Sequence, residues 1–211
     1  MAKGAVMGKI QSNKMQKRTS LLNTAFNLFI TKGVNKTTIA EISEAAGIAK
    51  GTFYLYFKDK YDIKNKLVSH KSGILFENAA AALDGHVLET NNELDFEDQM
   101  IFIVNYIIDA LSRDKSLLMF ISKNLSWGIF KEALYSKAEG KDTDFHAQFN
   151  DMILKSGYNI DEPEIMLFLI TELVSSTCYS TILYSEPTDI KSIKPYLFKS
   201  IRSIIDNHKT P

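Results

Sequence analysis

The stretch Thr37–Lys60, TTIAEISEAAGIAKGTFYLYFKDK, holds the strongest structural signal in this chain. Thr38 and Glu41 have the Thr-x-x-Glu spacing of a capping box, which predicts the start of a short helix. Gly47 then permits a sharp turn, and a second helix is expected from about Ala49 to Phe57. Two short helices joined by a glycine turn are the outline of a helix-turn-helix, whose second helix reads the major groove of DNA.

Charge is distributed unevenly around this motif. The chain of 211 residues has 25 basic and 25 acidic side chains, yet residues 1–71 hold 13 of the basic ones and four of the acidic ones. Residues 1–71 therefore carry a formal charge of +9, and residues 72–211 carry −9. An excess of lysine alone is often only a solvated surface. Because this excess coincides with the helix-turn-helix, it favours a surface that binds phosphates.

The rest of the sequence predicts an all-α fold in three parts. Apolar residues recur mostly at spacings of three and four, and no alternating run carries a hairpin dipeptide. We expect a disordered N-terminal arm over residues 1–13, a DNA-binding module of three helices over residues 14–60, and a larger helical domain over residues 61–211. The first helix runs from about Lys14 to Lys32 and ends at Gly33. Later helices are expected at about 60–83, 95–112, 115–137, 143–156, 163–185 and 193–207.

The second helix of the motif has one inward and one outward face. Phe53 and Phe57 are four residues apart and share the inward face. The outward residues are then Lys50, Thr52, Tyr54 and Tyr56. The two tyrosines are alternatively core residues, as aromatics at helical spacing usually are. A module this small cannot bury every aromatic of FYLYF, which favours contact with DNA for both.

Taken together, these features resemble the DNA-binding domain of the TetR family of bacterial transcriptional regulators. The resemblance is carried by FITKG at 29–33, by the stretch quoted above, and by the apolar pair Ile63 and Leu67. It implies that Thr38 contacts phosphate and that Lys60 holds the DNA backbone. It also implies a set of residues at the major groove or its rim: Lys50, Gly51, Thr52, Tyr54 and Tyr56. Ala49 departs from the family, which often has Ser or Thr there.

The second domain offers many aromatic side chains and a few polar ones, a mixture that is typical both of an ordinary core and of a small-molecule pocket. The resemblance implies an effector pocket in this domain. It also implies a homodimer formed through the last two helices, at 163–185 and 193–207. The expected pocket residues are Phe102, Tyr106, Asn124, Trp127, Phe130, Glu172 and Tyr179.

Other protein classes find little support. Cys178 is the single cysteine, which excludes an intrachain disulfide framework and fits a reducing, cytoplasmic compartment. The apolar stretch 165–184 is long enough to cross a membrane, but a carboxylate, Glu172, near its middle disfavours insertion.

Catalytic and metal sites are not expected either. The four histidines lack the paired spacing of a zinc site, and no nucleophile elbow, phosphate-binding loop or dinucleotide fingerprint occurs. The acidic group Glu93, Asp95, Glu97 and Asp98 is interpreted as a helix start rather than a metal site. We therefore expect no catalytic residues, no metal, no cofactor and no enzymatic activity.

The sequence predicts a cytoplasmic, sequence-specific regulator of transcription. In this hypothesis a homodimeric repressor binds double-stranded DNA at a palindromic operator, and a small, largely apolar effector of unknown identity releases it. Two alternatives stay open. One is a DNA-binding regulator or architectural protein without an effector, and the other is a TetR-like adaptor that no longer reads DNA.

Overall fold

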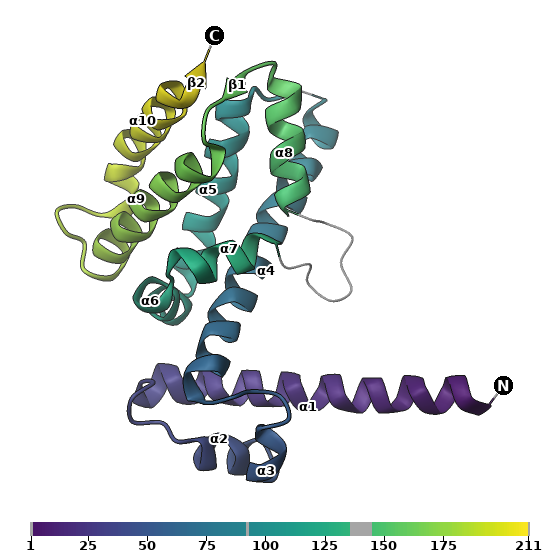
Figure 1. Ribbon diagram of the computed structural model, residues 1–211. Coiled ribbons are helices and arrows are strands. Elements are labelled where there is room, and N and C mark those ends of the chain that lie inside the picture. The colour runs from purple at the N-terminus through teal and green to yellow at the C-terminus, as the bar shows by residue number, and fades with distance from the viewer. Residues whose placement is uncertain (1, 92, 136–144, 211) are drawn as a thin grey trace. The chain divides into compact units, whose positions relative to one another are not determined.

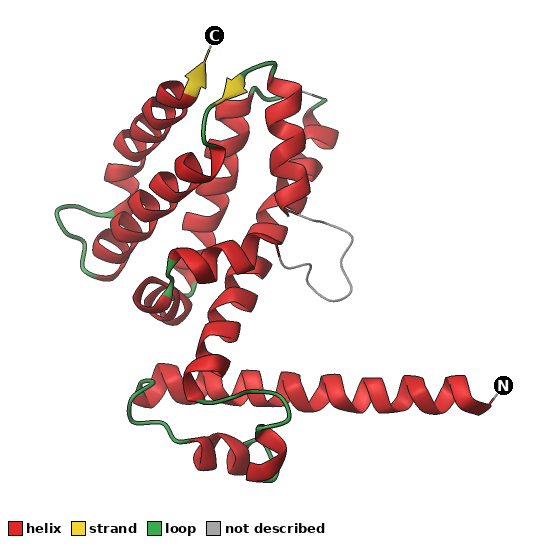
Figure 2. Ribbon diagram, viewed as in Figure 1, coloured by secondary structure: helices red, strands yellow, loops and turns green. Residues whose placement is uncertain are grey.

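The computed structural model describes residues 2–91, 93–135 and 145–210, which form ten α-helices and one two-stranded ladder (Figure 1, Figure 2). The all-α fold class is therefore confirmed. The chain divides into two compact units, Met1–Val68 and Ser69–Pro211. The domain limits expected from the sequence remain predictions.

The first unit contains α1 (Ala2–Lys32), α2 (Ile39–Ala45), α3 (Lys50–Phe53) and the first residues of α4 (Lys60–Thr90). Its core takes apolar side chains from all four helices and from the turn after α3. The buried members are Leu21, Leu22, Ala25, Phe29, Ile42, Phe53, Phe57, Ile63, Leu67 and Val68. Burying large apolar side chains on each short helix stabilises helices that would be marginal alone.

Helix α1 begins at Ala2, earlier than the sequence analysis expected. The stretch contains no proline, and its alanine, lysine, methionine and glutamine residues favour a helix, while Gly4 and Gly8 oppose it. At its other end, Gly33 adopts φ +82°, and its N–H donates to the Phe29 carbonyl, as expected for a glycine that ends a helix.

The second unit continues α4 and adds α5 (Phe96–Arg113), α6 (Lys115–Asn124), α7 (Trp127–Tyr135), α8 (Phe145–Ser156), α9 (Pro163–Leu183) and α10 (Ile190–His208). Figure 1 shows α9 and α10 side by side. Strand β1 (Asn159–Ile160) pairs antiparallel with β2 (Lys209–Thr210), a short ladder that the sequence analysis did not expect. The ladder joins the chain after α10 to the chain before α9.

The single helix expected at 115–137 is wrong, because the structure has two helices there. Leu125 is extended, with ψ 123°, and separates α6 from α7. The Asn124 side chain donates to the Phe120 carbonyl at 2.7 Å. Asparagine side chains compete with the helical backbone for hydrogen bonds, which favours an end at this position.

The acidic group before α5 lies at a helix start, as interpreted. Asp95 is the N-cap, and its Oδ1 accepts the Asp98 N–H at 2.7 Å. Glu97 forms an ion pair with Lys209, and Asp98 forms one with Arg202. Both basic residues lie near the carboxyl end of the second unit. Among the residues described, no group of three or more His, Cys, Asp or Glu is placed to hold a metal.

Helix α9 is long and apolar enough to cross a membrane by length and composition alone. It packs against α10, α6 and α5, and its buried side chains include Met166, Ile170 and Cys178. A helix that packs on three others in a core passes the same test, so its composition is weak evidence for a membrane span.

Candidate nucleic-acid interface

The start of α2 is held by the capping box expected from the sequence. The Glu41 N–H donates to Thr38 Oγ1 at 3.2 Å, and the Thr38 N–H donates to Glu41 Oε2 at 2.9 Å. Lys32 Nζ, at the end of α1, lies 2.6 Å from Glu41 Oε1. The hydrogen bond from Lys32, followed by those from Thr38, lowers the pKa of Glu41 to about 2. These hydrogen bonds order the start of α2, and Thr38 is exposed there.

Gly47 forms the turn between α2 and α3. Its φ is +66°, in the left-handed region, and its N–H donates to the Glu44 carbonyl at 3.0 Å. The next N–H, of Ile48, donates to the Ser43 carbonyl at 2.9 Å. A side chain with a Cβ is strained at this φ, so glycine permits the close approach of the two helices.

Helix α3 is shorter than predicted. It covers Lys50–Phe53, and the chain from Tyr54 to Phe57 continues as a tight turn rather than as helix to Phe57. The Leu55 and Tyr56 N–H groups bond to carbonyls three residues back, the pattern of a 3₁₀ turn. Ala49 is the N-cap and offers no side-chain hydrogen bond, so the cap that Ser or Thr supplies is missing.

The outward residues of this segment lie mostly at the surface. Phe53 and Phe57 are buried, as predicted, while Lys50, Gly51 and Tyr54 are exposed. Thr52 and Tyr56 are half-buried. A Cβ added at Gly51 would meet no atom within 4 Å, so the backbone of α3 is open on this side.

Lys60 is the first residue of α4. Its Nζ donates to the Asn35 carbonyl at 3.1 Å and lies 5.6 Å from the centre of the Tyr61 ring. Asp59 Oδ1 accepts the N–H groups of Tyr61 and Asp62, which fixes the helix start beside the lysine. Lys60 is half-buried as a residue, and its ammonium is held between the loop before α2 and the start of α4.

Leu55 was missed by the sequence analysis. Its side chain is 76% exposed, although leucine is an apolar residue on a segment with a buried face. Leu55 is two residues from Phe53 and two residues from Phe57, which form the inward face. In helical geometry, side chains two positions apart point to nearly opposite sides, so Leu55 is identified as lying opposite the inward face. An exposed apolar side chain beside exposed lysine and tyrosine suits contact with a thymine methyl group.

The second unit contains an apolar cavity of about 90 Å³. Its walls come from α4, α5, α6, α7, α8 and α9, and nearly all of them are aliphatic or aromatic. Four hydroxyl side chains, those of Ser72, Ser122, Thr171 and Ser175, are the exceptions. Ser72 Oγ is buried and has no hydrogen-bond partner among the residues that the structure describes.

Of the seven expected pocket residues, Phe130 lines this cavity. Trp127 stacks on Phe130 with ring centres 5.4 Å apart and lines a separate, shallower hollow beside Phe168. The side-chain amide of Asn124 bonds to its own helix, and Glu172 is exposed.

The other three expected pocket residues lie elsewhere in the unit. The Phe102 ring lies 5.1 Å from the His86 ring, Tyr106 packs against the core, and the Tyr179 hydroxyl lies 3.2 Å from that of Tyr184. The pocket residues expected from the sequence are aromatic or polar, whereas the walls of the cavity are largely aliphatic, with Ile103, Val104 and Ile107 on one face of α5.

The geometry of the first unit defines a helix-turn-helix protein. Residues 21–66 match the family described as bacterial regulatory proteins, tetR family. The match covers the helix-turn-helix segment of the chain, and the resemblance to the TetR family stated from the sequence is confirmed.

Relatives and solved structures agree with this assignment. The transcriptional regulator YerO of Bacillus subtilis, itself uncharacterized, is 26% identical over 183 residues, which are 75% of this chain and 63% of YerO. Thermus thermophilus FadR, solved with lauroyl-CoA, has a TM-score of 0.62 at 16% identity, covering 92% of this chain and 96% of FadR. A TetR family regulator from Marinobacter aquaeolei has a TM-score of 0.57 at 13% identity, covering 95% of this chain and all of the other. At these identities the structures show the shared fold.

Proposed function

We propose that this protein is a cytoplasmic, sequence-specific DNA-binding regulator of transcription. The observation that carries the proposal is the helix-turn-helix surface, on which Thr38, Lys50 and Tyr54 are exposed around an open Gly51. Lysine and tyrosine side chains and helix N-termini bind phosphates, and residues early in the recognition helix reach the bases. Thr52, Tyr56 and Lys60 complete the proposed contact set, and Leu55 is added to it.

The proposed active form is a homodimer. On α9 the apolar side chains of Ile165, Phe168 and Leu169 are 49%, 36% and 42% exposed. Apolar side chains clustered on one long helix favour contact with a second copy. A two-fold dimer presents two reading helices, which matches a palindromic operator.

The proposed regulation is release of DNA by a small, largely apolar effector that enters the cavity of the second unit. The cavity, about 90 Å³, is smaller than the apolar cavity of about 150 Å³ that holds benzene in another protein. A larger effector must therefore displace side chains, and it binds best to a conformation with a wider cavity. Ser72, Leu75 and Phe76 of α4 line the cavity, while Ile63 and Leu67 of the same helix belong to the core of the first unit. Helix α4 is the proposed route by which effector binding changes DNA affinity.

The first test recovers genomic DNA fragments bound by the purified protein and measures their affinity by fluorescence anisotropy at fixed salt. Tyr54→Ala is expected to weaken binding by about tenfold or more, since contacts to bases contribute about 1–3 kcal/mol each. Tyr158→Ala, an exposed tyrosine in the second unit, is the matched control and should leave affinity unchanged. If no fragment is enriched, the adaptor alternative is favoured.

The second test concerns the effector. Val104→Phe adds a ring to the wall of the cavity and is expected to abolish release of DNA by cell extracts while leaving operator affinity intact. Val104→Ile adds one methyl group and is expected to weaken release only partly. If no extract releases the unmodified protein, the regulator without an effector is favoured.

A further inference from the structure

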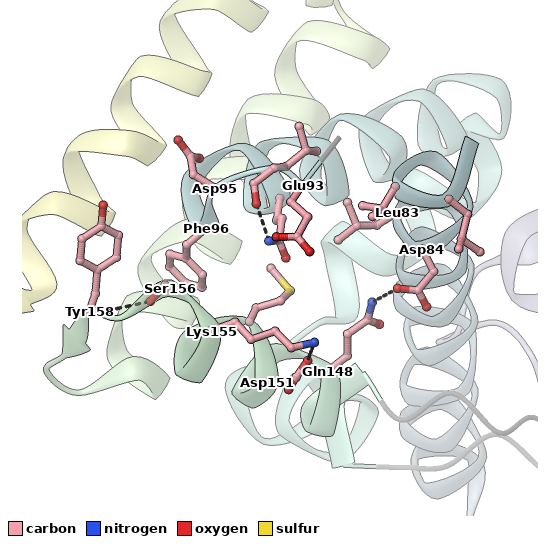
Figure 3. A pocket seen from close by; sticks show the side chains of 15 residues that line it. Leu83, Asp84, Glu93, Asp95, Phe96, Gln148, Asp151, Lys155, Ser156 and Tyr158 are labelled. Atoms are coloured by element: carbon pink, nitrogen blue, oxygen red, sulfur yellow. Dashed lines mark hydrogen bonds and ion pairs between the residues drawn. The ribbon is translucent and has the colours of Figure 1, made fainter. Parts of the chain in front are cut away.

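A second hollow lies in the second unit and shares no lining residue with the apolar cavity. Its volume is about 770 Å³, and its walls come from the end of α4, the start of α5 and from α8 (Figure 3). We call it the α4–α8 cleft. A cleft of this size is in the range of pockets that bind small molecules.

The floor of the cleft is apolar. Leu83 of α4, Phe96 of α5 and Met152 of α8 line it and are at least 96% buried within the unit. Leu88 and Tyr158, also in its lining, are 83% and 43% exposed. An apolar body placed on this floor would lose contact with water on the face that it presents to the floor, which favours binding.

The rim of the cleft is acidic. Four carboxylates line it, those of Asp84, Glu93, Asp95 and Asp151, against one ammonium, that of Lys155. Lys155 Nζ lies 2.7 Å from Asp151 Oδ2 and is 74% exposed. Its pKa is raised by the hydrogen bond to Asp151 and by the charges of Asp151, Glu93 and Asp84. The acidic rim therefore favours the binding of a positive charge, and the ammonium of Lys155 neutralises only part of the negative charge of the rim.

One polar atom in the lining is buried without a partner among the described residues. The Gln148 side chain donates from Nε2 to Asp84 Oδ1 at 2.9 Å, as Figure 3 shows, while its Oε1 is buried without a hydrogen-bond partner among the described residues. Burial raises the pKa of Asp84, opposed by the charge of Lys155. A ligand that carries N–H groups would donate to this buried acceptor, and the exposed carboxylate of Asp84 beside it attracts a cation.

We propose that the α4–α8 cleft binds an organic ammonium ion, a protonated primary amine attached to an alkyl or aromatic body. The ammonium lies beside Asp84 and Glu93, and the apolar body lies on Leu83, Phe96 and Met152. A bare metal ion would leave this floor without a partner. A fatty acid or other organic anion would meet the acidic rim and be repelled.

The test measures binding of octylamine to the full-length protein by isothermal titration calorimetry at pH 7 and fixed salt. Octylamine should bind in a saturable manner at one site, while octanol and octanoate, which share its alkyl chain, should bind at least about tenfold more weakly, since hydrogen bonds to charged groups contribute about 1.5–3 kcal/mol. Equal affinity for octanol, or no saturable binding of octylamine, would overturn the proposal.

Variants locate the site. Asp84→Asn with Glu93→Gln keeps the side-chain shapes and should weaken octylamine binding by about tenfold or more. Lys155→Gln removes the internal competitor and should tighten binding several-fold, a change that a damaged fold does not produce. Val104→Phe, in the apolar cavity, should leave octylamine affinity unchanged. Loss of binding in Val104→Phe with retention in the double variant would place the amine in the apolar cavity and refute the cleft as its site.

Discussion

At the scale of single residues, Glu41 connects the end of α1 to the start of α2. Its pKa is about 2 in the folded protein, below its ordinary 4.5, because Lys32 and Thr38 donate hydrogen bonds to the carboxylate. A folded-state pKa below the unfolded value stabilises the fold above about pH 4.5, and this contribution is lost as the pH falls toward about 2.

Glu41→Gln should therefore lower the melting temperature of the first unit at pH 6, and the difference from the unmodified protein should shrink toward pH 2.5. Thermal unfolding followed by circular dichroism across this range measures the effect. Glu44→Gln, on the same helix, is the matched control and should show a smaller difference at pH 6. A difference for Glu41→Gln that stays constant down to pH 2.5 would contradict the assigned hydrogen bonds.

Cys178 lies fully buried on α9, and burial raises the pKa of its thiol to about 12. Because the thiolate is the reactive form, the folded protein at pH 8 should react with Ellman's reagent far more slowly than the chain unfolded in guanidinium chloride. Comparing the two rates of absorbance change measures the protection. A folded protein that reacts as fast as the unfolded chain would show that α9 opens readily.

At the scale of elements, α3 allows the stability of the fold and the proposed binding of DNA to be tested separately. Gly51 lies inside this helix with no atom within 4 Å of an added Cβ. Gly51→Ala should leave the free energy of unfolding unchanged or raise it by up to about 1 kcal/mol, since alanine has the higher helix propensity. If the open side faces DNA, the same methyl group should weaken operator binding by about tenfold.

Denaturation with urea and fluorescence anisotropy measure the two quantities on the same variant. Gly128→Ala is the matched control, because Gly128 is also helical and equally open but belongs to α7 in the second unit. It should behave like Gly51→Ala in stability and like the unmodified protein in DNA binding. Equal DNA affinity for both variants would remove Gly51 from the interface.

The sequence predicted the elements of the first unit well because their signals are local. The capping box at Thr38, the glycine turn at Gly47 and the inward pair Phe53 and Phe57 each act within a few residues. The end of α3 at Phe53 was not predicted, since apolar spacing continues unchanged into the turn.

In the second unit the signals are less local. The break between α6 and α7 contains neither glycine nor proline, and depends on Asn124 and on packing. The cavity depends on which aliphatic side chains of separate helices converge, and no motif encodes that. The α4–α8 cleft was likewise not predicted, because its residues are up to 75 positions apart, from Leu83 to Tyr158.

At the scale of the whole molecule, the prediction concerns assembly. Leu169 is 42% exposed on α9, within the proposed dimer surface. Leu169→Glu places a charge there and should shift the mass measured by light scattering from that of a dimer toward the monomer, 23.9 kDa. It should also reduce operator affinity, since a single reading helix binds weakly.

Leu154→Glu is the matched control for this change. Leu154 is 80% exposed on α8, outside the proposed dimer surface, so the same charge should leave both mass and operator affinity unchanged. A monomeric unmodified protein, or a Leu169→Glu variant that remains dimeric, would contradict the assignment of this surface.

Trp127 is the single tryptophan of the chain. It stacks on Phe130, a wall of the apolar cavity, and meets Phe168 edge-on with ring centres 5.3 Å apart. Indole emission depends on the polarity and packing around the ring, so displacement of Phe130 changes the intrinsic fluorescence of the protein. The molecule thus carries one built-in optical reporter beside its cavity, and compound libraries can be screened against it without any attached dye.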